Sequence, residues 1–124
     1  MFSVVDGVIG GEGCGPLTPD PKESACLLAG ENPLAVDLVA TRLMGFDPMS
    51  LKIYSQALGN EEYNFGFRRL DEIAVLNGDP SVRRCLEDQE SKFLDFKPHP
   101  GWIGHIEAQT RTEEPLECKT VQYP

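Results

Sequence analysis

The sequence lacks any long hydrophobic run and is poor in basic side chains. No stretch approaches the roughly 18 consecutive apolar residues that a membrane-spanning helix needs. The chain has 11 Lys and Arg residues against 20 Asp and Glu residues, for a formal net charge of -9. Because affinity for phosphate backbones comes largely from Lys and Arg, we expect no nucleic acid and no anionic membrane surface as a partner.

Cysteines are few, and their spacing matches no redox or metal motif. Cys14, Cys26, Cys85 and Cys118 include no CxxC pair. An even number of cysteines permits two disulfides, but the chain starts without the basic segment of a secretory signal. We therefore expect reduced thiols in a cytoplasmic protein, and a four-cysteine metal site is the weaker alternative.

Signatures of nucleotide binding and of serine hydrolases are also missing. No Gly-Lys-Ser/Thr sequence is present, which excludes a nucleotide-binding P-loop. No nucleophile elbow accompanies the two histidines, so a Ser–His–Asp hydrolase is not indicated. His99 and His105 flank Trp102 in a stretch of irregular composition, where surface or packing roles are favoured over a metal pair.

Local composition predicts three strands and two helices. Strands are expected over residues 2–9, 25–30 and 70–76, the first of them ending in a glycine-rich loop. A helix over 33–44 is delimited by an N-cap Asn, a Pro at the first position and a Gly just past its end. A second helix is expected from 49 to about 58, and one or two helical turns over 81–86.

This order of elements predicts an α/β fold. We expect two or three layers, with a short, mostly parallel or mixed sheet and two or three helices. A single domain would span residues 1–109, followed by a polar tail over 110–124 that is either mobile or an edge strand. The apolar helix needs more cover than three strands provide. We therefore expect either a homo-oligomer or half of a larger domain, completed by a segment before residue 1.

Short motifs along the chain occur in the order seen in one protein family. They are Asp6-Gly7, Glu12-Gly13-Cys14-Gly15-Pro16, Leu28-Ala29-Gly30, Ala35-Val36-Asp37 and Leu43-Met44-Gly45-Phe46-Asp47-Pro48. Together they resemble the C-terminal part of the domain of unknown function 362 family. Cys14 stands where members often have Asn. The resemblance implies an association with ferredoxin-type iron–sulfur clusters, which here would have to lie on a segment or partner outside this chain.

The glycine-rich loop is the first candidate site. Gly11, Gly13 and Gly15 alternate with other residues directly after a predicted strand. Glycines in such a loop allow backbone N–H groups to approach an anion or another ligand. The alternative is a tight strand exit whose glycines adopt positive φ angles. Cys14, within this loop, is the one cysteine expected to be reactive or to bind a soft metal.

Three acids form the second candidate site. Asp6 and Glu12 flank the glycines, and Asp37 interrupts the otherwise apolar helix. Carboxylates gathered at a strand end would make a divalent-cation site or an acid/base pair. Alternatively, they fix the loop by accepting hydrogen bonds from its backbone.

From these features we expect a ligand- or cation-binding α/β module, associated with redox chemistry through an iron–sulfur partner. The alternatives are a metal-dependent enzyme half-domain, with Glu12 or Asp37 as acid/base, and a purely structural or oligomerising unit. Substrate, reaction and metal are not indicated by the sequence.

Overall fold

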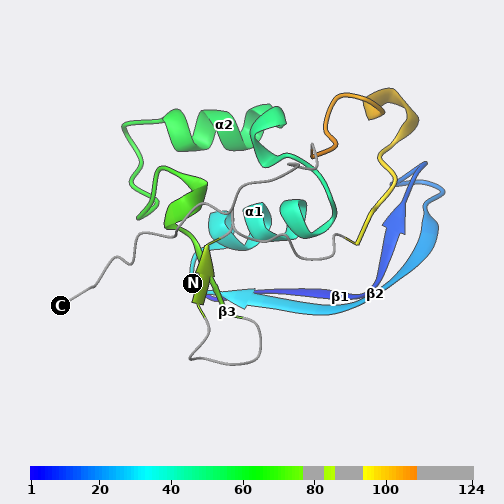
Figure 1. The fold of residues 1–124 in the computed structure, drawn as a ribbon, viewed down its shortest axis with the longest axis horizontal. Coiled ribbons are helices and arrows are strands. Elements are labelled where there is room, and N and C mark those ends of the chain that lie inside the picture. The colour runs from blue at the N-terminus through cyan, green and yellow to red at the C-terminus, as the bar shows by residue number, and fades with distance from the viewer. Residues whose placement is uncertain (77–82, 86–93, 109–124) are drawn as a thin grey trace.

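The computed structural model describes residues 1–76 and 94–108, together with the backbone of residues 83–85 (Figure 1). Its strands and helices are β1 (Ser3–Glu12), β2 (Asp20–Gly30), α1 (Pro33–Leu43), α2 (Lys52–Gly59), β3 (Ala74–Leu76) and β4 (Arg83–Cys85). Short 3₁₀ turns lie at Pro48–Ser50, Leu70–Glu72 and Pro100–Trp102. The predicted mixed α/β class is confirmed. The tail predicted over 110–124 lies outside the described residues.

The first two strands form a long antiparallel hairpin. Ser3 lies opposite Gly30 and Glu12 opposite Asp20, with a shift of register between Gly7 and Ile9. The prediction of a strand ending before the glycine-rich loop was wrong, because β1 continues through Gly10 and Gly11 to Glu12. Only seven residues, 13–19, connect the two strands. A parallel pair needs a crossover of about a dozen residues or more, so this connection imposes antiparallel pairing.

The second pair of strands is antiparallel as well. Residues of β3 pair with those of β4, with Ala74 opposite Cys85 and Leu76 opposite Arg83. The mostly parallel or mixed sheet that we predicted is therefore not found among the described residues, whose strands form two separate two-stranded sheets. The helical turns predicted over 81–86 were wrong at Arg83–Cys85, which form β4.

Helix α1 begins where the sequence predicts, at Pro33, and ends one residue earlier than predicted, at Leu43. The Asn32 side chain accepts a hydrogen bond from the Ala35 backbone N–H at 3.3 Å, which satisfies one of the free donors of the first turn. Gly45 follows with φ of 93°. Helix α2 begins later than predicted, at Lys52, because Asp47 caps the 3₁₀ turn Pro48–Ser50 instead of an α-helix.

Two hydrophobic clusters hold the described residues together. In the first cluster, the fully buried Leu38 of α1 packs with Leu58 of α2, Phe67 and Ile73. The second cluster joins Phe46, just after α1, to residues near the C-terminal end of the described chain, Phe96 and Ile106. No helix in the described part of the chain is long and apolar enough to cross a membrane.

The hairpin presents one face to α1 and the other to solvent. Figure 1 shows β1 and β2 running along α1 and then bending toward the segment that ends at residue 108. On the opposite face, Val4, Val8 and Leu27 are 62%, 53% and 70% exposed. The expectation that a second copy or another segment provides further cover remains a prediction.

Candidate functional site

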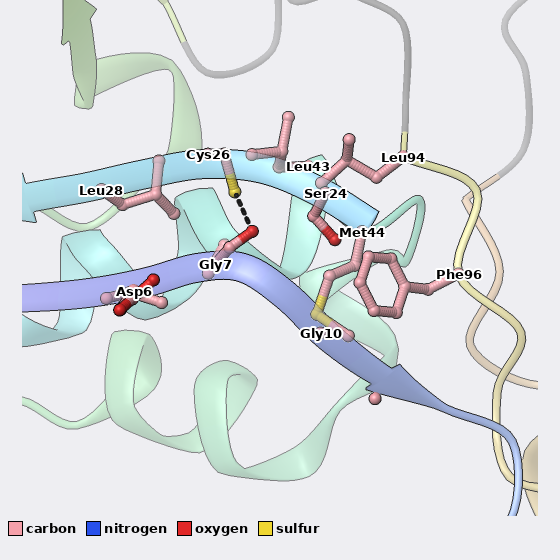
Figure 2. A pocket seen from close by; sticks show the side chains of 13 residues that line it. Asp6, Gly7, Gly10, Ser24, Cys26, Leu28, Leu43, Met44, Leu94 and Phe96 are labelled. Carbon is pink, nitrogen blue, oxygen red and sulfur yellow. Dashed lines mark hydrogen bonds between the residues drawn. The ribbon is translucent and has the colours of Figure 1, made fainter. Parts of the chain in front are cut away.

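A cavity of about 180 Å³ lies between the hairpin and the C-terminal half of α1 (Figure 2). The hairpin contributes Val5 and Leu28 to its wall, and the α1 side contributes Ala40. Leu94 and Phe96 line it from a segment far along the chain (Figure 2). Most of the lining is therefore apolar. Such a surface favours an uncharged ligand, because burying an unpaired charge there is costly.

Two polar side chains of β2 face the cavity. The Ser24 hydroxyl donates to the Lys22 carbonyl at 3.3 Å, and the Cys26 thiol donates to the Gly7 carbonyl at 3.6 Å (Figure 2). Both side chains lie on the inner face of the hairpin, because alternate residues of a strand point to the same side. The Ser24 oxygen keeps its lone pairs, so it can accept one hydrogen bond from a ligand.

Glycines of β1 allow the parts of this site to approach closely. A Cβ atom at Gly7 would lie 2.6 Å from the Cys26 sulfur. One at Gly10 would lie 2.6 Å from Cζ of Phe96. These distances are too short for any larger residue without displacement of the neighbour. Close packing therefore accounts for the glycines in β1.

Glu12 lies at the end of β1, and its carboxylate is held by several donors. Its Oε2 accepts the Lys97 backbone N–H at 3.0 Å and lies 3.2 Å from the Lys22 ammonium. The Lys97 ammonium lies 3.8 Å from Oε1. The hydrogen bond from the Lys97 backbone lowers the pKa of Glu12, with help from Lys22, although partial desolvation opposes this effect. Glu12 therefore stays ionised near neutral pH.

This pKa shift predicts how stability depends on pH. A lowered pKa in the folded protein contributes stability above the unfolded value of about 4.3, and that stability is lost as pH falls through the folded pKa. We expect Glu12→Gln to be less stable than the wild type near pH 6, and the difference to shrink below about pH 4. Denaturant unfolding of both proteins across this pH range measures the difference in their free energies of unfolding. A difference that is independent of pH would contradict the assignment.

The predicted site residues fall into separate places. Asp6 and Gly11 line the cavity, although the Asp6 side chain is exposed and its Oδ1 accepts the Val8 N–H at 3.2 Å. Gly13 has φ of 72° and donates its N–H to the Lys97 carbonyl at 3.0 Å. Gly15 lies beyond it in the loop that joins the two strands.

The acids predicted to form one cluster do not gather. Asp37 is exposed on α1, whereas the Glu12 carboxylate is bound to the lysines. Within residues 1–76 and 94–108, no group of three or more Cys, His, Asp or Glu side chains is placed to hold a metal ion. The three-carboxylate arrangement of Asp6, Glu12 and Asp37 is thus corrected, because the helix face that carries Asp37 points to solvent.

The cysteines and histidines also occupy different settings. Cys14 is an exposed free thiol in the connecting loop, whereas Cys26, also free, borders the cavity. The Nδ1 atom of His99 accepts the Gly101 backbone N–H at 3.2 Å, which is a role in turn formation. His105 is exposed.

Sequence reasoning missed the residues that shape the cavity. Ser24 and Cys26 were not singled out as candidate site residues. Alternation along β2 could have placed both on one face, had the strand been extended back beyond residue 25. Phe96 carries no comparable local signal, because its position depends on contacts with distant residues.

Comparison with known proteins is informative for the first third of the chain. No curated protein and no solved structure matches this chain. Residues 1–42, which contain the whole hairpin and all but the last residue of α1, match a described family. That family is the domain of unknown function (DUF362), the family that the sequence motifs were predicted to resemble.

Proposed function

We propose that this chain is a cytoplasmic binding module whose cavity holds a small, uncharged and mainly apolar ligand, or the apolar part of a larger one. The observation that supports it is the cavity of about 180 Å³ between the hairpin and α1, with its predominantly apolar lining. Association with an iron–sulfur partner remains a prediction from the family resemblance.

The size of the cavity suits a single small ring. An apolar protein cavity of about 150 Å³ stays dry and binds benzene, because the ligand restores dispersion contacts that an empty space lacks. The cavity described here has a comparable volume but is partly open to solvent. Ser24 and Cys26 supply polar atoms at one wall, so a ring that bears one hydrogen-bond donor also fits.

The positions of the acids favour binding over acid/base chemistry. Glu12 is ionised and already bound by Lys22 and Lys97, so it is poorly suited to donate a proton near neutral pH. Asp37, the other candidate acid, is exposed on α1 and does not line the cavity. The enzyme alternative therefore draws no support from the described residues.

Thermal unfolding in the presence of toluene tests the proposal. A ligand that binds only the folded state stabilises it by about 1.4 kcal/mol at ten times its dissociation constant, so the unfolding midpoint should rise with toluene concentration. The control is p-toluenesulfonate, which has the same ring with a fixed negative charge and should not bind an apolar cavity. No shift with toluene, or an equal shift with p-toluenesulfonate, would refute the proposal.

A further inference from the structure

Residues 94–97, which we call the strap, form the part of the cavity wall that comes from furthest along the chain. Leu94 and Phe96 both line the cavity, and Phe96 is buried. Figure 2 shows the Phe96 ring lying over β1 beside Gly10. Because this glycine has no side chain, the ring can approach the strand directly.

The backbone of the strap is attached to the C-terminal end of α1. The Leu94 N–H donates to the Leu43 carbonyl at 2.8 Å, and the Phe96 N–H donates to the Met44 carbonyl at 2.9 Å. Carbonyls at the end of a helix have no partner within the helix, so these two bonds satisfy groups that otherwise need water. They fix the strap against one side of the cavity.

The other side of the strap is attached to the hairpin through charged groups. Glu12 accepts the Lys97 N–H, and Lys22 donates to the Asp95 carbonyl at 2.6 Å. The same Lys22 ammonium lies 5.3 Å from the centre of the Phe96 ring, within the range of a cation–π contact. Only 10% of the Glu12 side chain is exposed, so its contacts are partly shielded from water.

We propose that the strap is a lid over the cavity and that Glu12 is its latch, so that opening at Glu12 controls access of ligands. This inference rests on the proposed function. Opening requires that the contacts of Glu12 and Lys22 with the strap are released and that its backbone hydrogen bonds to α1 and Gly13 break. Phe96 then leaves the second hydrophobic cluster, while the first cluster around Leu38 stays folded. Glu12→Gln keeps the shape of the side chain and an acceptor for the Lys97 N–H, but removes the charge that attracts both lysines.

Alkylation of Cys26 by iodoacetamide measures opening without any ligand. Cys26 is half-buried and borders the cavity, whereas Cys14 is exposed and serves as an internal reference in the same molecule. Peptide mapping by mass spectrometry gives the two rates separately. We expect Glu12→Gln to raise the alkylation rate at Cys26, relative to Cys14, by about fivefold.

Two controls separate a latch from general destabilisation. Glu23→Gln removes an exposed acid of β2 that does not line the cavity, and should leave the relative rate unchanged. Amide hydrogen exchange should accelerate at Leu94 and Phe96 in Glu12→Gln but not at Leu38. An unchanged Cys26 rate, an equal effect of Glu23→Gln, or acceleration at Leu38 as well, would overturn the proposal. If Glu12→Gln raises the relative alkylation rate at Cys26 but toluene does not bind, the proposed ligand is refuted, whereas the proposed lid is supported.

Discussion

Leu38→Ala should lower the free energy of unfolding by about 2–5 kcal/mol. Leu38 is completely buried and packs with Leu58, Phe67 and Ile73, so truncation loses both transfer free energy and the contacts around the new cavity. A domain of this size is stable by only about 5–15 kcal/mol, so the substitution removes a large share of the total.

Leu27→Ala is the matched control, with the same chemical change at a side chain that is 70% exposed on the hairpin. It should change stability by no more than about 0.5 kcal/mol. Urea unfolding of the wild type and both variants gives the three free energies, with similar slopes if unfolding is two-state. Equal losses for the two variants would mean that the core is not built around α1 as described.

Ala40→Leu should weaken binding of toluene by at least about tenfold, or roughly 1.4 kcal/mol. Ala40 lines the cavity from α1, and three added carbon atoms would occupy the space proposed for the ligand. Filling a pre-existing cavity commonly leaves stability unchanged or raises it by about 0.5–2 kcal/mol. Loss of affinity without loss of stability therefore distinguishes a blocked site from a damaged fold.

The control for this substitution is Ala74→Leu, the same change at an exposed residue of β3 that does not line the cavity. Its affinity for toluene should stay within about twofold of the wild type, since a rim or remote surface change is energetically small. Isothermal titration calorimetry on the three proteins provides the comparison. Wild-type affinity in Ala40→Leu would show that toluene binds elsewhere.

Local signals were enough to predict α1. Asn32 caps the helix, Pro33 occupies its first position and Gly45 follows its end, and each of these preferences acts within one turn. The sequence also predicts the two-helix α/β class. The lengths of the strands and their antiparallel direction were harder to predict from the sequence, because the glycines of β1 and Pro21 of β2 are typical of loops. A Pro is tolerated near the start of a strand in which one edge is open.

The candidate site could be predicted only in part, because it depends on contacts between distant segments. Glu12 was singled out correctly as a residue of interest, but its partner Lys97 lies 85 positions away. Phe96 reaches Gly10 across a similar separation, and neither residue carries a pattern that points to the other. Asp37 breaks an apolar helix pattern simply because that face of α1 is exposed.

A toluene titration followed by ¹H–¹⁵N NMR tests the central claim most directly. If the cavity between the hairpin and α1 binds small apolar ligands, saturable shifts with one dissociation constant should concentrate at the lining residues Gly7, Gly10 and Leu43. The amides of Val4 and Leu27, on the outer face of the hairpin, should move little. Shifts that do not saturate, or that concentrate on this outer face, would contradict the account.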